Sequence, residues 1–500
     1  MKKIKILALF AFLGFMSCDN YLDVNDSPNN AKDTDITPDL ALAAAQTSSY
    51  ANVTTTMNFL GNLYMNNWGY DVNSYAVTSP PEFTHSIDNS FYQAVWNTPM
   101  RASANLTNII NTEFPNYENH VAIAKICKAY YFQYIVDMYG DVPYSQAHLG
   151  VIDITPSYDD AKTVYRDLYE ELSEAIALID NSPNAKSVGG EDAVFAGNML
   201  KWKDFANTIK LRLLMRQSDL ADSGTDSETT AYLADKFMND LAGASFLTED
   251  ATLNPGYSAD KSDTRNPFWN VMYAADNETV SGFYRQYKCS DRNAALLNDT
   301  ADPRRFKLFT AVGGTIVGVK QGDSSTTNGG LAPSTLSSFG TGVLSGPSQD
   351  AYMMSHAESL LLQAEAVHRG YMAGDAQTLF NSALAASFAQ LGAVPGTYIS
   401  DINNSPGQGY GAGSYADKIA AIMYQKNIAL QGTSNVLEVF IEYTRTGLID
   451  SVPGTILTAT LAHPNRPRRL MYPSTEYSTN SANVPAQGDV FTTGSFWYAY

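Results

Sequence analysis

The sequence has few of the residue types that build most catalytic and redox centres. It contains six histidines and three cysteines in 500 residues, and no two cysteines form a Cys-x-x-Cys pair. A thiolate metal site or a redox dithiol is therefore not indicated. The motifs HExxH and GxSxG and a phosphate-binding loop are also absent from the sequence. We therefore expect no catalytic residues, no bound metal and no cofactor.

Basic residues are scarce as well. The chain has 32 Lys and Arg against 51 Asp and Glu, which gives a formal net charge of −19. Because such a surface repels a phosphate backbone, we expect no nucleic-acid partner. Apolar residues make up 44% of the chain and charged residues 17%, a composition typical of a globular protein. The many aromatic and amide side chains suit recognition of sugars or extended peptides.

The apolar run at the N-terminus is too short to span a bilayer. It extends from Ile6 to Met16, behind lysines at positions 2, 3 and 5, whereas a membrane helix needs about 20 apolar residues. A charged start, an apolar stretch and the small residue Ser17 are typical of a secretory signal peptide.

Cys18 follows this stretch directly and resembles the cysteine of a bacterial lipobox, although Phe15 stands where Leu is commoner. We predict that residues 1–17 are removed and that Cys18 is lipidated as the mature N-terminus. The alternative is a buried helix with an incidental cysteine. Removal of residues 1–17 takes away three lysines and no acid, so 29 basic residues face 51 acidic ones, a formal charge of −22.

The other two cysteines are interpreted as structural. Cys127 lies in an apolar helical pattern and is expected to pack as a small hydrophobic residue. Cys289 lies in an aromatic segment. A disulfide between them is possible outside the cytoplasm and stays open, because the sequence gives no distance.

Helical periodicity dominates the chain after a polar tether at 18–36. Thr37 and Pro38 resemble an N-cap followed by proline at the first helical position. The spacing of apolar residues predicts helices at about 38–63, 91–112, 117–138, 156–179, 202–215, 349–369, 374–391, 414–430 and 434–446. Residues 241–348 and the tail 448–500 lack this periodicity, so we expect irregular structure with small strands there.

We therefore predict a mostly α protein with one domain at 37–500. Its helical scaffold would occupy about 37–240 and 349–447, with a long irregular insertion between the two parts. Paired helices with short turns suggest a tetratricopeptide-type stack, although the strict 34-residue repeat is absent.

Several stretches resemble the SusD/RagB family of outer-membrane lipoproteins. The start of the mature chain, CDNYLDVN at 18–25 with Pro28-Asn29 after it, is similar to the family's N-terminus. Similar segments follow in the family's order: YGDVPYSQA at 139–147, KDFANTIKLR at 203–212, SLLLQAEAVHRG at 359–370, QKNIAL at 425–430, EVFIEYTRTG at 438–447 and RRLMYP at 468–473 with Glu476 and Asn480. Asn427 and Thr444 depart from the pattern, where Trp or Tyr and Arg are expected.

The resemblance implies a SusD-like helical scaffold and a function without chemistry. It implies a lipid-anchored outer-membrane protein, facing the cell exterior, that binds nutrient oligosaccharides and delivers them to a TonB-dependent barrel of the SusC type. Two alternatives stay open: a peptide-binding member of the same family, and an all-α envelope glycoside hydrolase, whose two carboxylates can be distant in the sequence. A purely structural helical adaptor is a third possibility.

Most of the motifs that carry the resemblance have a structural interpretation. We predict that Glu365 is buried and paired with a cation, for which Arg445 and Arg212 are candidates. Glu82 and His85 form a Glu-x-x-His pair, but Glu82 follows two prolines and is expected in a loop. Asp219, Asp222 and Asp226 lack the ordered spacing of an EF-hand and are interpreted as solvated acids.

Two aromatic stretches are the candidate ligand-binding site. A sugar needs exposed aromatic faces beside amides and charged groups, and such faces belong on loops because aromatics at helical spacing usually form core. Trp96 is excluded for that reason. The first stretch holds Asn66, Asn67, Trp68, Tyr70, Asn73 and Tyr75, and the second holds Arg265, Asn266, Phe268, Trp269, Asn270 and Tyr273.

The stacking interpretation predicts that Trp68→Ala or Trp269→Ala weakens ligand binding by about 1–3 kcal/mol with little change in thermal stability. The alternative is that both tryptophans fill joints between helices.

Overall fold

The computed structural model describes residues 36–71, 80–320, 331–449 and 461–499. The predicted signal peptide, Cys18 and residues 18–35 of the predicted tether lie outside these residues, as do Asn73 and Tyr75. Within the described ranges, no helix is both long enough and apolar enough to cross a membrane.

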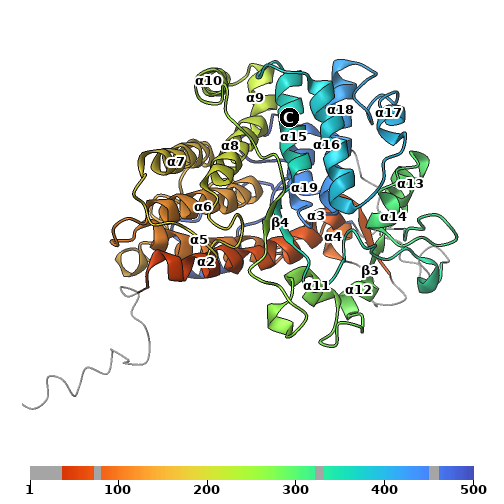
Figure 1. The fold of residues 1–500 in the computed structure, drawn as a ribbon, viewed down its shortest axis with the longest axis horizontal. Coiled ribbons are helices and arrows are strands. Elements are labelled where there is room, and N and C mark those ends of the chain that lie inside the picture. The colour runs from red at the N-terminus through yellow and green to blue at the C-terminus, as the bar shows by residue number, and fades with distance from the viewer. Residues whose placement is uncertain (1–35, 72–79, 321–330, 450–460, 500) are drawn as a thin grey trace, which may run out of the picture.

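The N-terminal half is a layer of long helices packed side by side (Figure 1). Its elements are α2 (Pro38–Asn52), the π-helical segment η2 (Val53–Met57), α3 (Asn58–Tyr64), α5 (Ala94–Ile110), α6 (Glu118–Tyr139), α7 (Ala161–Asn181) and α8 (Met199–Arg216). Helix α5 packs on α2 and α6, and α7 packs on α6 and α8. The first helix is nearly continuous to Tyr64, as its periodicity predicts.

The C-terminal helices form a second group, shown in cyan and blue in Figure 1. They are α15 (His356–His368), α16 (Ala376–Leu391), α17 (Tyr398–Ile402), α18 (Tyr415–Gln431) and α19 (Leu437–Thr446). Helix α15 packs on α16, α18 and α8, so it links the two helical groups. The predicted class, a mostly α protein built on a helical scaffold, is confirmed.

The insertion between the two groups is built from short elements (Figure 1). They are β2 (Ala251–Leu253), α11 (Pro267–Met272), α12 (Gly282–Gln286), β3 (Tyr287–Cys289), α13 (Asp291–Asp299), α14 (Arg305–Leu308) and β4 (Ala351–Met354). Strand β1 (Trp68–Tyr70) pairs antiparallel with β3, and β2 pairs antiparallel with β4. These two small sheets attach the insertion to the scaffold.

Three hydrophobic cores hold these parts together. The largest lies among α2, α5 to α8 and α19, and a second lies among α15 to α18. The third is aromatic and joins α3 and β1 to the insertion. Trp96 belongs to the largest core and is 2% exposed, as predicted. Cys127 and Cys289 are buried free thiols.

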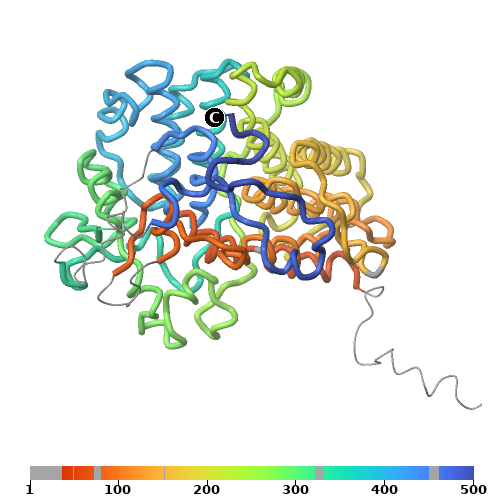
Figure 2. The backbone as a smooth tube through the Cα atoms, turned by 180° about the vertical axis from the view of Figure 1, so that it is seen from behind, coloured from red at the N-terminus to blue at the C-terminus, as the bar shows by residue number. Residues whose placement is uncertain are grey.

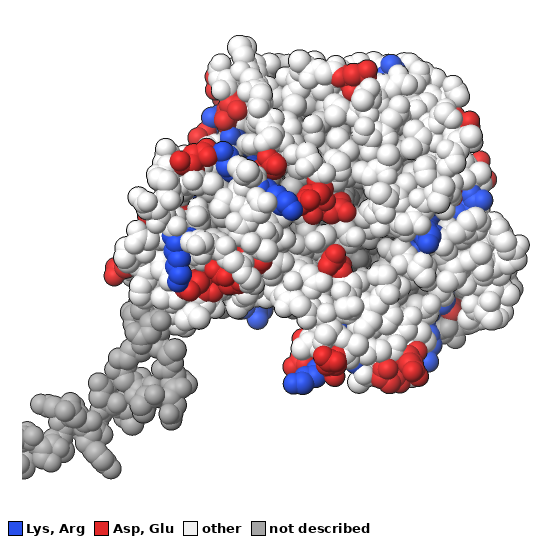
Figure 3. Space-filling view, viewed as in Figure 1, with Lys and Arg blue, Asp and Glu red and all other residues white. Residues whose placement is uncertain are grey.

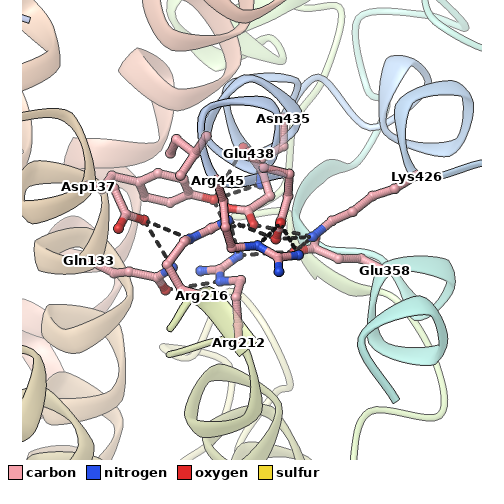
Figure 4. A network of polar contacts seen from close by, with 12 residues as sticks. Gln133, Asp137, Arg212, Arg216, Glu358, Lys426, Asn435, Glu438 and Arg445 are labelled. Carbon is pink, nitrogen blue, oxygen red and sulfur yellow. Dashed lines mark hydrogen bonds and ion pairs between the residues drawn. The ribbon is translucent and has the colours of Figure 1, made fainter. Parts of the chain in front are cut away.

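A buried network of charges joins the two helical groups (Figure 4). Arg216 of α8 pairs with Glu438 at 2.5 Å and with Glu442 at 2.7 Å, both on α19. Lys426 of α18 pairs with Glu442 at 3.0 Å. Burial alone would raise the pKa of Glu442, but Arg216, Arg445 and Lys426 together hold it well below its usual range. A network paired in this way fixes the relative placement of the helices that supply it.

The C-terminal tail crosses the back of the N-terminal helices, where it is dark blue in Figure 2. Its only helix among the described tail residues is α20 (Ser474–Thr479). Near its end, Trp497 is 1% exposed and its indole Nε1 donates to Asp137 of α6 at 3.0 Å. The tail is therefore part of the core although it is irregular.

Several local predictions need correction. Helix α7 begins at Ala161 rather than at Pro156, because Asp160 is the N-cap and accepts from the backbone N–H of Thr163. Residues 351–354 form strand β4 rather than the start of a helix. Glu82 lies in a short helix, α4 (Pro81–Thr84), rather than in a loop.

The three acids interpreted as solvated are paired with cations instead. Asp219 and Asp222 both bind the guanidinium of Arg369, and Asp226 binds Lys162. The described residues contain no group of three or more His, Cys, Asp and Glu side chains placed to hold a metal ion.

Candidate functional site

The structure brings the two predicted aromatic stretches together. Strand β1 carries Trp68 and Tyr70 and pairs with β3 at the edge of the insertion. The Trp68 ring stacks near that of Phe268, the first aromatic residue of α11, with centroids 6.2 Å apart. The two stretches, which are about 200 residues apart in the sequence, therefore lie next to each other in the fold.

The predicted exposure of these side chains is wrong. Trp68 is 2% exposed and Phe268 is fully buried. Tyr70, Trp269, Asn66 and Arg265 are also buried. The Arg265 guanidinium donates to the carbonyl oxygens of Ala274 and Ala275. The four aromatic residues belong to the third core because β1 and α11 turn their aromatic faces inward, and a buried ring offers no face on which a sugar can stack.

Two residues at the second stretch reach the surface. Tyr273 is half-buried and stacks on Trp269, with centroids 4.0 Å apart, and Asn270 is exposed. Tyr284 of α12 lies 5.7 Å from Tyr273. Whether Tyr273 or the buried residues contribute to ligand binding stays a prediction, as does the role of Tyr75.

An open polar cavity of about 420 Å³ lies on the other side of α11, at its N-cap. Figure 3 shows that this face of the molecule is hollowed near its centre. The lining comes from four parts of the chain: Tyr50 and Thr54; Asn266; residues 341–343, 345 and 348–352; and the ends of two helices at 389–392 and 432–434. The volume lies within the range of small-molecule sites.

Local structure explains why these segments meet. Helices α16 and α18 end side by side, and Gln390 Nε2 donates to the carbonyl oxygen of Gly432 at 3.2 Å. Tyr50 Oη donates to the carbonyl oxygen of Tyr352 at 2.5 Å, which fixes β4 against the first helix. Asn266 caps α11 and also donates to the carbonyl oxygens of Gln349 and Asp350, at 3.1 and 3.4 Å. Hydrogen bonds from Tyr50 of α2, from the N-cap of α11 and between the ends of α16 and α18 therefore fix the cavity wall.

The cavity combines an aromatic ring with hydrogen-bonding groups. Tyr352 is half-buried in the wall, and burial, followed by the charges of Asp250 and Asp350, raises its pKa. Gln390, Ser345 and Thr433 are also among the residues that line this space. A half-exposed ring beside amides and hydroxyls suits a ligand with an apolar face and a rim of hydroxyls, as in a sugar.

Two other cavities of similar size are less suitable. One, of about 410 Å³, is lined by Ile36, Leu40 and alanines of α2 together with Asn105, Asn108 and Thr112, and its lining includes no aromatic ring on which a sugar could stack. The other, of about 360 Å³, lies between α13 and α17, where Asp299 and Asp401 form part of its lining. Its single aromatic residue, Tyr398, is 6% exposed. Of these three cavities, the central one alone combines a half-exposed aromatic ring with several uncharged hydrogen-bonding groups, so we take it as the candidate site.

The sequence reasoning missed Tyr352, Gln390 and Asp350. Tyr352 falls in a stretch interpreted as helix, and Gln390 stands at the end of a predicted helix without any special pattern. No sequence signal shows that the ends of α16 and α18 meet strand β4. Of the described residues in the two predicted stretches, only Asn266 lines the cavity.

Comparisons with known proteins agree with this fold. No curated protein sequence matches the chain. A solved structure titled "chitin-binding protein" has a TM-score of 0.72 and 23% identity, and the match covers 94% of this chain and 100% of that one. A SusD homologue from Bacteroides uniformis has a TM-score of 0.72 and 23% identity, with coverage of 92% and 99%. A chitin-binding SusD homologue from Flavobacterium johnsoniae has a TM-score of 0.70 and 19% identity, with coverage of 92% and 97%.

The family assignment rests on the sequence of nearly the whole chain. Residues 28–473 match the SusD-like family that is described as "Starch-binding associating with outer membrane". This range contains most of the resembling stretches, from Pro28-Asn29 to RRLMYP at 468–473. The chain belongs to the SusD-like family of outer-membrane-associated nutrient-binding proteins.

Proposed function

We propose that this protein binds oligosaccharides in the central cavity and passes them, without chemical change, to an outer-membrane transporter. The observation that carries the proposal is the combination of Tyr352, Gln390 and a hydroxyl-rich wall in one open cavity. Membership of a family described as starch-binding supports a glycan ligand. Two similar structures are titled as chitin-binding, so chitin oligosaccharides belong among the first ligands to test.

The cavity favours binding over hydrolysis. Glycoside hydrolases usually place two carboxyl groups about 5–9.5 Å apart across the scissile bond. The lining of the central cavity includes one carboxylate, that of Asp350. A peptide ligand is the second candidate within the family, because the same amides and hydroxyls can pair with a peptide backbone.

A binding panel tests this proposal. The chain that lacks residues 1–18 is titrated by calorimetry with maltotetraose, cellotetraose, mannotetraose and chitotetraose, and with a tetrapeptide mixture as the alternative. We expect saturable binding of at least one tetrasaccharide and no new reducing ends after prolonged incubation. Binding of peptides alone contradicts the glycan ligand, and release of reducing ends contradicts the absence of chemistry.

We also propose that Cys18 is lipidated, that the protein faces the cell exterior, and that it works with a TonB-dependent barrel of the SusC type. The apolar run before Cys18 and the family description support membrane attachment. The Cys18→Ala variant should lose a labelled fatty acid and leave the membrane fraction. Mild detergent extraction of the wild-type protein should co-purify a barrel, through an interface of at least about 1,200 Å². Acylation of the Cys18→Ala variant would contradict the proposed lipidation. Recovery of the wild-type protein without a barrel would contradict the proposed transporter partner.

A further inference from the structure

The charge that lines the central cavity is of one sign, negative. Among the described residues that line it, Asp350 is the only charged one. Its carboxylate is held in place because Asn254 Nδ2 donates to Oδ1 at 2.7 Å. Glu249 and Asp250 stand at the start of β2, the strand that pairs with β4. Burial raises the pKa of Asp250, His356 partly opposes this, and the charges of Glu249 and Asp350 raise the pKa of Asp250 further.

Two helices add negative potential to the same space. The last turn of α16 contributes Ala389, Gln390 and Leu391, and α18 contributes its C-cap, Gly432. The C-terminus of a helix carries about half a negative charge, because its last carbonyl groups have no partner within the helix. The C-terminal ends of two long helices therefore line the same cavity as Asp350.

No cation of the lining opposes this charge. Lys307 packs its backbone against Gly342 but is not among the lining residues. Arg265, next to Asn266 in the sequence, uses its guanidinium on two carbonyl oxygens away from the cavity. Lys201 pairs with Glu249 and leaves the carboxylate of Asp350 without compensation from that side.

We infer that the central cavity selects neutral oligosaccharides and rejects acidic ones, and that Asp350 is the residue that sets this preference. The inference rests on the proposed function and assigns its substrate class. A uronate or a sulfate group on the ligand would meet Asp350 and both helix ends without a counter-charge. A neutral sugar can donate hydroxyl hydrogens to the same oxygen atoms.

The test compares two forms of one sugar. The tetrasaccharide of the panel that binds most tightly is titrated beside the same sugar with its primary alcohols oxidised to carboxylates. We expect the oxidised form to bind roughly fivefold more weakly or worse, the order of a like-charge contact with a solvent-exposed carboxylate. The ratio of the two Kd values should shrink at high salt, because mobile ions screen this repulsion.

Two variants distinguish an effect of the Asp350 carboxylate from an effect of the total net charge of the protein. Asp350→Asn keeps an oxygen for Asn254 and should reduce the ratio of the Kd values several-fold. Asp299→Asn removes the same charge at the separate cavity between α13 and α17 and should leave the ratio unchanged.

Each of the remaining outcomes contradicts either the inference or the proposed function. Equal Kd values for the two forms, or an equal effect of Asp299→Asn, overturn the inference and leave the proposed function intact. Tight binding of the oxidised form that is lost in Lys307→Gln also overturns it, because Lys307 would then recognise the acid. Failure of every neutral tetrasaccharide to bind contradicts the proposed function itself.

Discussion

The guanidinium Nη2 of Arg445 donates to both carboxylate oxygens of Glu365, at 2.9 Å each, and both side chains are almost completely buried. Arg445 lies on α19 and Glu365 on α15, so the pair joins two helices that are 80 residues apart in the sequence. Arg369, one turn after Glu365, binds the same carboxylate at 2.9 Å. The buried charges therefore act as ties between helices of the scaffold.

Removing one member of this pair should be costly. Arg445→Met leaves the carboxylate of Glu365 buried with one cation fewer, so we expect the free energy of unfolding to fall by about 3–5 kcal/mol. Lys203→Met is the matched control, because Lys203 and Asp180 form a pair that is largely exposed on the Asp180 side. Urea unfolding should show a loss of at most about 1 kcal/mol for the control. Equal losses in the two variants would contradict this role of the buried pair.

The crossing of α3 and α19 has no room for a side chain at Gly61. A Cβ atom there would lie 2.3 Å from the backbone nitrogen of Leu437. Because backbone cannot move as a side-chain end can, we expect Gly61→Ala to destabilise the protein by about 1–3 kcal/mol or more. Gly190→Ala, which would meet no atom within 4 Å, is the control. Thermal unfolding that is unchanged in Gly61→Ala would show that the crossing is looser than described.

Trp68 has a structural role that the sequence reasoning underestimated. Its ring packs against Phe268, Tyr287 and Phe339 in the aromatic core. We now expect Trp68→Ala to lower the free energy of unfolding by about 3–5 kcal/mol, as for other buried aromatic residues. Tyr273→Ala, at the half-buried edge of this core, should cost much less. A Trp68→Ala variant with wild-type stability and weakened glycan binding would restore the earlier stacking interpretation.

Asp137 should make stability depend on pH. Burial raises its pKa to about 6, against a partial opposing effect of Arg216. The folded protein therefore keeps a proton that the unfolded chain releases above about pH 4. The contribution of Asp137 is full below pH 4 and is lost as the pH rises through 6.

The Asp137→Asn variant isolates this contribution because its side chain is neutral throughout. The difference in the free energy of unfolding, wild type minus variant, should fall by about 2 kcal/mol between pH 4 and pH 6.5. Urea unfolding at several pH values measures it. A constant difference over this range would show that Asp137 titrates normally.

The sequence predicts the scaffold well because the helices are long and periodic. Helices α5, α6, α16 and α18 begin and end within about three residues of their predicted limits, and Glu365 pairs with Arg445 as expected. The candidate site was harder because exposure depends on tertiary packing. Trp68 stands between two loops in the sequence, yet β1 pairs with β3, more than 200 residues later, and turns it inward. Tyr352 faces the cavity only because α16 and α18 end beside β4.

The central claim is that an oligosaccharide binds in the cavity of which Tyr352 forms a wall. Calorimetric titration of the tightest tetrasaccharide into three proteins tests it most directly: wild type, Tyr352→Ala, and Tyr477→Ala, which removes an exposed tyrosine on α20. The account predicts that Tyr352→Ala weakens binding by about 1–2 kcal/mol, a five- to thirtyfold increase in Kd, whereas Tyr477→Ala binds as wild type. Wild-type affinity in a folded Tyr352→Ala variant would contradict the account.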